Sequence, residues 1–438
     1  MRTARDFDIA IIGAGAAGLM AAVSASELVP GRRILLLEKN DRPGKKLYAT
    51  GNGRCNFLNR GAEPAHYFSR ESAESVEDWV APVLQASSPA ALESLFDGLG
   101  VTAVHLEEGR LYPRSLQAES VVEALADCIR TRGVELRTRA TVVECRKTAD
   151  GFILKSDSGE THRTRCVLLA TGGKAGIQYG SSGDGYKIAT SLGHRLAKPI
   201  PALTQIVVEL PDAALSGVRV RGAVSLWRFA SAEAQEIARD EGEIQLTPDG
   251  ISGICTFNIS RYYEIAPDRS YAVQLDFFPE YEDEELLKIL KKRKQQLAGR
   301  SAGTFLNGLL PAKLAAHLMA EVGVDSVARS GSLEEEQLHR IVAQCKRYER
   351  RVAGTKSWKH AQVTAGGVLL REVDPGTLQS KKTPSLYFAG EILDVDGPCG
   401  GFNLTWAFAS GRVAGLSAGR SVASEENVRS SPAEPAAP

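Results

Sequence analysis

A glycine-rich turn near the N-terminus has the spacing that binds a dinucleotide. The apolar run Asp8–Ile12 leads into Gly13, Gly15 and Gly18, and helix-favouring residues follow. Gly13 permits a tight turn, Gly15 lets backbone N–H groups approach a diphosphate, and Gly18 allows close packing of helix on strand. Glu38 ends the next apolar run, where its carboxylate can accept hydrogen bonds from ribose hydroxyls. These features predict a Rossmann-type unit that holds either NAD or FAD.

Later segments favour FAD over NAD. Asn40–Lys46 places glycine and cations just after the ribose-binding acid, and Ala49–Asn56 is a polar glycine loop suited to a phosphate chain or a flavin edge. Val167–Gly173 is an apolar strand that ends in small residues, where the backbone can pass close to a dinucleotide. Leu386–Glu391 is another apolar strand, and Cys399–Asn403 begins a helix whose amides could stabilise negative charge on a reduced flavin.

Flavin chemistry needs few protein groups, because the cofactor itself carries the two electrons. His360 could act as a base near the ring, or could be a surface or packing histidine. Cys55 and Cys399 could exchange electrons with the flavin as a thiol pair, although buried cysteines are commonly packing residues. Arg110 could meet an anionic group of the substrate, or could be solvated. The sequence does not identify a catalytic residue. Trp406 and Phe408 are expected to pack in the core rather than against the substrate.

The pattern along the chain predicts an α/β fold in which a β-rich domain interrupts the FAD-binding domain. We expect the first part of the FAD-binding domain at 1–195 and the second at 359–421. The β-rich domain is predicted at 196–358, with a helical insertion at about 280–335. The segment from Leu333 to Val352 is predicted to be helical, the last helix is predicted to run from about Asn403 to Gly419, and the tail 422–438 to be disordered.

Composition limits the partners that the chain can have. The chain has 438 residues, with 53 Lys and Arg against 53 Asp and Glu, so no net field favours nucleic acid. Seven dispersed cysteines without metal-ligand spacing indicate reduced thiols, no metal site and a cytoplasmic protein. No apolar stretch approaches the length of a membrane span. We therefore expect a small-molecule substrate, no nucleic acid and no membrane, and the oligomeric state stays open.

Taken together, these segments resemble the BaiN-like, or aminoacetone oxidase-like, family of bacterial FAD-dependent oxidoreductases. The resemblance is carried by DIAIIGAGAAGLMAA from Asp8, GNGRCNFLN from Gly51, QVTAGGV from Gln362 and YFAGEILDVDGPCGGFNLTWAFASG from Tyr387. It spans nearly the whole chain and implies an FAD domain assembled from both ends. Thr405 departs from the pattern, since a Gln is common at that position.

The motifs and the resemblance together predict the residues that line the cofactor. The pattern between about Val134 and Leu169 predicts a meander of strands, in which the backbone of Val142 or Val143 is expected to meet adenine. The full predicted set is Gly13, Ala14, Gly15, Ala17, Gly18, Glu38, Lys39, Gly44, Lys45, Lys46, Gly51, Asn52, Gly53, Arg54, Cys55, Asn56, Val142, Val143, Ala170, Thr171, Gly172, Gly390, Glu391, Gly400, Gly401, Phe402 and Asn403.

The resemblance implies an FAD-dependent oxidoreductase, and three functions are compatible with the sequence. The first is oxidation of a small, aminoacetone-like amine, with electrons passing from FAD to oxygen or another acceptor. The second reverses the flow, so that NAD(P)H reduces the flavin and the flavin reduces an enone. No second strand–GxGxxG–helix unit follows Pro199, so NAD(P)H would bind only transiently. The third is a tRNA-modifying or non-catalytic flavoprotein, against which the balanced charge argues.

Overall fold

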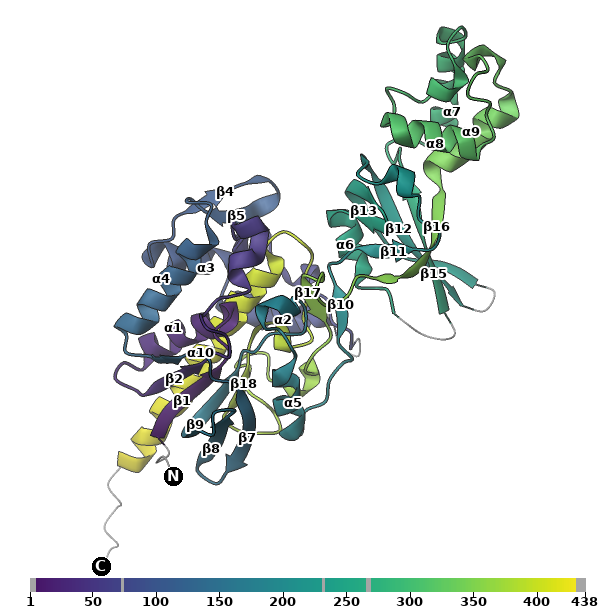
Figure 1. Ribbon diagram of the computed structural model, residues 1–438. Coiled ribbons are helices and arrows are strands. Elements are labelled where there is room, and N and C mark those ends of the chain that lie inside the picture. Colours follow the sequence, from purple (N-terminus) through teal and green to yellow (C-terminus); the bar gives the residue numbers. More distant parts are fainter. Residues whose placement is uncertain (1–4, 72–74, 231–232, 265–268, 431–438) are drawn as a thin grey trace, which may run out of the picture. The chain divides into compact units, whose positions relative to one another are not determined.

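The computed structural model (Figure 1) describes residues 5–71, 75–230, 233–264 and 269–430. The chain divides into two compact units, of which unit 1 comprises residues 1–200 and 363–438 and unit 2 comprises residues 201–362. The predicted insertion, 196–358, begins and ends a few residues earlier than unit 2. The reason is that Ala197 and Gly367 exchange two backbone hydrogen bonds within unit 1. The chain therefore leaves unit 1 a few residues later than the change in sequence pattern indicates.

Unit 1 is built on a mostly parallel sheet. Within the described residues this sheet has seven strands, in the order β6-β2-β1-β9-β8-β7, with β18 pairing with β9. Parallel pairing joins β6, β2, β1, β9 and β18, whereas β7, β8 and β9 form the predicted antiparallel meander. The strands are β1 (Arg5–Ile12), β2 (Ile34–Leu37), β6 (Glu135–Arg137), β7 (Val142–Thr148), β8 (Gly151–Ser156), β9 (Thr161–Leu169) and β18 (Leu386–Phe388). Both faces of the central strands are covered, which is why β2 is apolar throughout.

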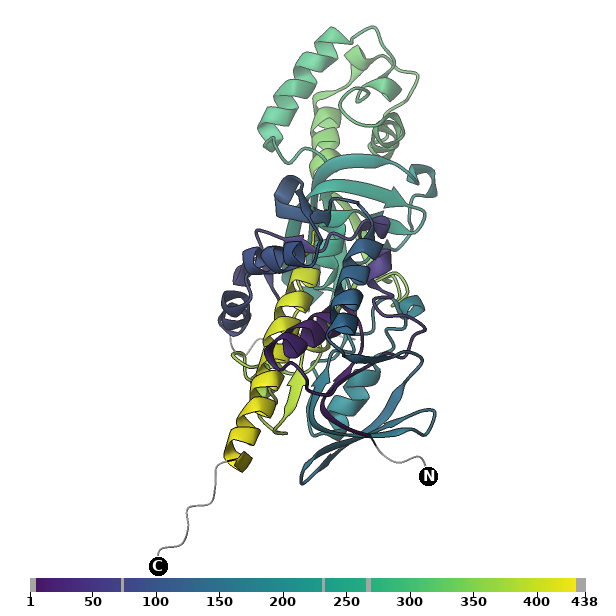
Figure 2. The same cartoon turned by 90° about the vertical axis from the view of Figure 1, so that its left-hand side faces the viewer.

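Two helices from opposite ends of the sequence lie side by side in unit 1, as Figures 1 and 2 show for α1 (Ala16–Leu28) and α10 (Phe402–Ser430). Small residues permit this contact, because a Cβ added to Gly411 or Gly415 would collide with α1 backbone. The C-terminal helix is thereby fixed against the glycine turn of the N-terminus. The other helices of this unit are α2 (Val76–Ala86), α3 (Pro89–Gly98), α4 (Ala118–Thr131) and α5 (Asp184–Ser191).

The last helix is longer than predicted. α10 continues to Ser430, so the prediction of disorder is wrong for residues 422–430, while residues 431–438 lie outside the described residues. The physical reason is that the segment after Gly419 lacks a helix breaker until Pro432, and a polar composition by itself does not end a helix.

Unit 2 is a closed barrel with a group of helices. Its strands follow the order β11-β14-β13-β12-β15-β16. They are β11 (Ile206–Val208), β12 (Arg219–Ala230), β13 (Glu233–Thr247), β14 (Gly250–Ser252), β15 (Arg269–Asp276) and β16 (Tyr348–Thr355). The helices are α6 (Ile254–Ser260), α7 (Asp283–Gln296), α8 (Ala312–Glu321) and α9 (Glu335–Lys346). The helical prediction for Leu333–Val352 is wrong after Lys346, because Tyr348 begins the strand that pairs with β15 and β11.

Two small sheets complete the fold. The two connections between the units contain β10 (Ile200–Ala202) and β17 (Val363–Ala365), which form a two-stranded sheet. In unit 1, β3 (Leu58–Asn59), β5 (Arg110–Pro113) and β4 (Ala103–His105) form an antiparallel sheet in that order. Among the described residues, no helix combines the length and apolarity needed to cross a membrane.

Candidate functional site

The glycines of the N-terminal turn divide into two structural roles. Gly13 has φ +98°, and a Cβ there would lie 2.5 Å from the carbonyl oxygen of Ala170. A Cβ on Gly18 would collide with the carbonyl oxygen of Gly13, so both positions require glycine for packing. Gly15 is different, because a Cβ there would meet nothing within 4 Å. The open space at Gly15, beside the first turn of α1, suits a diphosphate bound to backbone amides.

Glu38 holds the glycine turn as well as facing the expected ribose position. Its side chain is 7% exposed, and its Oε2 accepts a hydrogen bond from the amide of Ala14 at 2.8 Å. Its Oε1 accepts from the amide and the side-chain amide of Asn40, both at 2.8 Å. A carboxylate has about four acceptor positions, so about one remains for a ribose hydroxyl. The sequence predicted the ribose role but not this anchoring of two loops.

Lys39 is committed to a neighbouring turn. Its ammonium lies 2.6 Å from Oδ2 of Asp184 and contacts the hydroxyl of Ser182. Burial opposes ionisation of Asp184, but hydrogen bonds from Lys39 and Ser182 outweigh it and lower the pKa of that carboxyl. Lys39 therefore ties the turn before α5 to the sheet, and its charge is already compensated. Because Asp184 and Ser182 already bind this ammonium, fewer of its N–H donors remain for a cofactor than the sequence indicated.

Glu391 belongs to a polar cluster that joins four segments of the chain. Its Oε2 accepts from the ammonium of Lys46 at 2.8 Å, and its Oε1 accepts from the amide of Thr364 at 2.7 Å. The Thr364 hydroxyl in turn accepts from the amides of Lys174, at 2.8 Å, and Ala175, at 3.1 Å. The predicted residues Lys46 and Glu391 thus come together with a threonine that sequence reasoning did not single out. Its signal was the motif QVTAGGV, in which glycines follow a short strand.

The loop from Gly51 to Asn56 is exposed over its first four residues and buried at Cys55. Asn52 and Cys55 have left-handed φ values of +55° and +58°, and the side chains from Gly51 to Arg54 are exposed. Cys55 is buried, and burial raises the pKa of its thiol to about 11. A thiol that stays protonated is a poor electron-exchange partner, which argues against the redox pair with Cys399. No disulfide joins any of the seven cysteines, all of which lie in the described part of the chain.

The start of α10 meets this loop. Gly400 and Gly401 have φ values of +116° and +99°, and a Cβ on Gly401 would lie 2.9 Å from Oδ1 of Asn56 and 2.7 Å from the carbonyl oxygen of Leu58. Asn403 does not reach outward, because its side chain bonds with the amide and carbonyl of Gly397 at 2.8 Å. Thr405 donates to the carbonyl of Gly401 at 3.0 Å. The helix that the sequence predicted to begin in the segment Cys399–Asn403 does begin there, at Phe402.

The adenine-facing candidates lie at the edge of the meander. Val142 is buried, while Val143 is 57% exposed. The pairing of β7 with β8 shifts register between Val142 and Glu144, so Val143 has no cross-strand partner in β8. Because of this irregularity and its exposure, Val143 is the better candidate of the two.

The residues fit FAD. Two buried polar atoms, Oγ1 of Thr171 and Oδ1 of Asn56, lack a hydrogen-bond partner among the described residues. Each belongs to a segment predicted to line the cofactor, and a Cβ on neighbouring Gly172 would again meet nothing within 4 Å. Open glycine backbone and unpartnered buried acceptors and donors are what an extended, polar dinucleotide would satisfy. The remaining predicted lining residues, Ala17, Gly44, Lys45, Ala170, Gly390 and Phe402, lie in the same unit.

Four other predicted residues have the following surroundings. His360 is exposed and belongs to unit 2. Lys45 pairs with Asp41 across a surface turn at 3.4 Å. Trp406 and Phe408 are fully buried, which confirms that they belong to the core.

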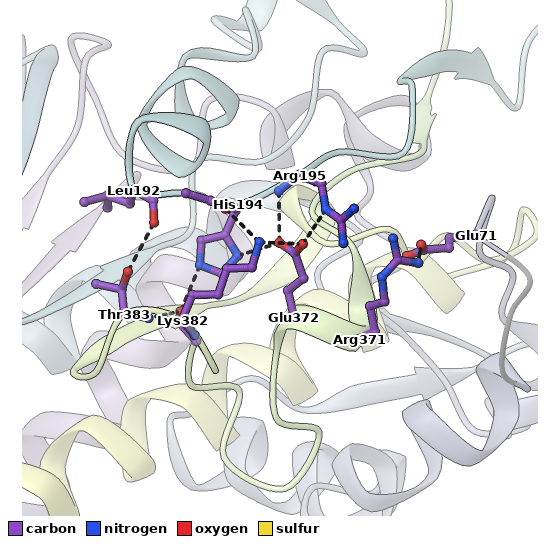
Figure 3. Close-up of polar contacts among 10 residues, drawn as sticks. Glu71, Leu192, His194, Arg195, Arg371, Glu372, Lys382 and Thr383 are labelled. Carbon is purple, nitrogen blue, oxygen red and sulfur yellow. Dashed lines mark hydrogen bonds and ion pairs between the residues drawn. The ribbon is translucent and has the colours of Figure 1, made fainter.

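A buried polar network anchors the returning chain in unit 1 (Figure 3). Glu372, 4% exposed, accepts from the amide and guanidinium of Arg195 at 2.9 and 3.0 Å and from the Lys382 ammonium at 2.7 Å. His194 lies between Glu372, 3.3 Å from its Nδ1, and Ser380, 2.8 Å from its Nε2. Burial lowers the pKa of His194, although the neighbouring Glu372 carboxylate opposes this shift. The network joins the segment that leaves unit 1, at His194 and Arg195, to the segment that re-enters it, at Glu372.

Comparisons with known proteins identify the family to which the chain is similar. The family described as HI0933-like protein Rossmann domain matches residues 7–417. The chain is 36% identical over 413 residues to the 3-dehydro-bile acid delta(4,6)-reductase of Clostridium scindens, covering 94% of this chain and 98% of that protein. It is 28% identical over 404 residues to the ribosomal RNA dihydrouridine synthase of Escherichia coli, covering 92% of this chain and 96% of that protein.

Solved structures overlap with the chain at low identity. A flavocytochrome c3 fumarate reductase is 15% identical with a TM-score of 0.48, covering 96% of this chain and 79% of that chain. A 3-ketosteroid delta1-dehydrogenase from Sterolibacterium denitrificans is 14% identical with a TM-score of 0.47, covering 95% of this chain and all of that chain.

Proposed function

This chain belongs to the HI0933-like family, and on that premise we propose that it reduces a carbon–carbon double bond conjugated to a carbonyl group. It is an FAD-dependent oxidoreductase. The observation that carries the proposal is the 36% identity, over 94% of the chain, to a protein named as a bile acid delta(4,6)-reductase. The dihydrouridine synthase relative is also named for adding hydrogen to a ring, that of uridine.

The residues of unit 1 divide the work of binding. The amides around Gly15 would hold the diphosphate, and Glu38 a ribose. The cluster of Lys46, Thr364 and Glu391 would hold the middle of the cofactor, and the amides of Gly400–Phe402 would stabilise negative charge at its ring. FAD, when bound, supplies two-electron hydride chemistry. The protein's own contribution is to orient the substrate and to stabilise the charge that forms on its carbonyl oxygen.

NAD(P)H is the proposed source of the hydride. The balanced reaction adds a hydride and a proton across the double bond while NAD(P)H becomes NAD(P)⁺. The proton adds at the α-carbon of the enolate and comes from solvent or from a protein acid. Because that carbon accepts a proton readily, no dedicated acid is required. The sequence lacks a second strand–GxGxxG–helix unit after Pro199, which supports transient binding of the nicotinamide nucleotide.

Two other substrates compete with an enone. Oxidation of an aminoacetone-like amine was predicted from the family resemblance, yet neither relative described above is named for an amine. An RNA substrate is favoured by the dihydrouridine synthase relative. Against it stands the equal number of basic and acidic residues, 53 of each, because RNA-binding proteins carry a basic surface. We therefore propose a small-molecule substrate.

Anaerobic half-reactions test the proposal. The purified holoenzyme is mixed with NADPH, NADH or aminoacetone, and bleaching of the flavin absorbance identifies the electron donor. The bleached enzyme is then mixed with 2-cyclohexen-1-one, 4-androstene-3,17-dione or a uridine-containing ribosomal RNA fragment. We expect NADPH or NADH to bleach the flavin and an enone to restore its colour. Bleaching by aminoacetone alone, or recovery with RNA but with no enone, would refute the proposal.

A further inference from the structure

The edge of the small sheet in unit 1 is bound to the start of α10. Arg110, the first residue of β5, pairs across the sheet with Asn59 of β3. The Asn59 side chain is buried, and its Nδ2 donates to the carbonyls of Gly400 at 2.8 Å and Glu108 at 3.0 Å. Its backbone amide donates to the hydroxyl of Thr405 at 2.9 Å. Arg110 therefore starts from a backbone that is fixed relative to the helix N-terminus.

The Arg110 side chain lies against the glycine pair of that helix. Its Nε is 3.7 Å from the position that a Cβ would take on Gly400, and the side chain is 27% exposed. The guanidinium contacts the carboxylate of Glu108, which is the one acceptor it meets among the described residues. A guanidinium has five N–H donors, so several remain for a ligand. Glu108 is 72% exposed and has φ +58°, uncommon for a residue other than glycine.

Among the described residues, two other cations predicted to line the cofactor are already paired. The Lys46 ammonium is held by Glu391, and Lys39 is held by Asp184. Cys55 is a buried thiol with its pKa raised to about 11. Arg110 differs from these because it lies beside the glycines whose amides face the expected flavin ring, is partly exposed, and keeps donors in reserve. A planar group of this kind suits an oxygen that gains negative charge.

We propose that Arg110 binds the carbonyl oxygen of the substrate and stabilises the negative charge that develops there during reduction. This inference rests on the proposed function. As a hydride reaches the β-carbon, the electron pair of the double bond moves to form an enolate, whose oxygen carries the charge. A proton then adds at the α-carbon, and NAD(P)H is the reductant overall. Glu108 acts as a positioning residue, because it orients the guanidinium.

Two substitutions at Arg110 and one matched control test this inference. Arg110→Gln removes the charge and Arg110→Lys keeps it without the planar fork. Arg114→Gln is the control, since Arg114 is an exposed arginine just beyond the same strand. Flavin content, thermal stability and the rate of flavin bleaching by NAD(P)H are measured first. The rate at which 2-cyclohexen-1-one or 4-androstene-3,17-dione restores the colour follows, together with the dissociation constant of 4-cyanophenolate, an enolate mimic, from its effect on the flavin spectrum.

We expect Arg110→Gln to slow recovery by the enone about 100-fold, as for loss of one oxyanion donor, while bleaching by NAD(P)H stays within twofold of the unmodified enzyme. Phenolate binding should weaken at least tenfold, and Arg110→Lys should give intermediate values. Enone recovery and phenolate binding that match the unmodified enzyme would overturn the inference and leave the proposed function standing. An equal fall in both half-reactions with loss of flavin would also overturn it, because it indicates a structural role. An unmodified enzyme that neither reacts with an enone nor binds the phenolate overturns both.

Discussion

Replacing Glu372 by glutamine should remove a defined, pH-dependent part of the stability of unit 1. Burial opposes ionisation of Glu372, but hydrogen bonds from Lys382 and Arg195 outweigh it and lower its pKa from 4.5 to about 2 (Figure 3). At 1.36 kcal/mol for each pH unit, this difference corresponds to about 3 kcal/mol. Because the folded pKa lies below the unfolded one, the stabilisation is complete above about pH 4.5 and disappears as the pH falls towards 2. We expect Glu372→Gln to lower the free energy of unfolding by about 2 to 3 kcal/mol at pH 7.

The assay is urea unfolding followed by circular dichroism at several pH values between 7 and 3. Glu144→Gln is the matched control, since Glu144 is an exposed glutamate in the same unit, and it should change the free energy of unfolding by no more than about 0.5 kcal/mol. The difference between the unmodified protein and Glu372→Gln should shrink as the pH falls below about 4.5. A difference that is below 0.5 kcal/mol at pH 7, or that is the same at every pH, would refute this account of the network.

Three further predictions follow from the packing around the cofactor site. Gly15→Ala should leave the melting temperature of the flavin-free protein unchanged but weaken FAD binding at least tenfold by fluorescence titration, whereas Gly18→Ala should prevent folding; equal behaviour of the two variants would contradict the division of roles. Cys55 should resist alkylation by iodoacetamide in the native protein at pH 8, as followed by mass spectrometry, because its thiol is buried with a pKa near 11; rapid native labelling would contradict this. Lys46→Met should lower FAD occupancy and destabilise the protein by about 1 to 3 kcal/mol in thermal unfolding, because Glu391 loses the cation that compensates its charge. The double variant Lys46→Met/Glu391→Gln should regain part of that stability.

Local patterns in the sequence predicted the Rossmann unit and the residues expected to line its cofactor. Gly13, Gly15 and Gly18 have roles that follow from backbone conformation and close approach, which depend on the absence of a side chain and hence on residue type alone. The apolar run Ile34–Leu37 likewise predicted a buried strand from residue type alone. The family to which the chain belongs followed from motifs of this kind, and the fold class with it.

Tertiary structure decided which polar side chains are free to act. Lys39, Lys46 and Asn403 all lie in motifs that indicate a cofactor, yet their side chains bond with Asp184, Glu391 and Gly397, residues that local periodicity does not connect to them. Long-range partners also decided secondary structure, since Tyr348–Thr355 is a strand because the barrel pairs it on both sides. The sequence offered Arg110 either as a contact for an anionic group of the substrate or as a solvated arginine, and only the pairing of β3 with β5 places it beside Gly400. Charges and hydrogen bonds act over a few ångströms in space, so their partners are set by the fold rather than by distance along the chain.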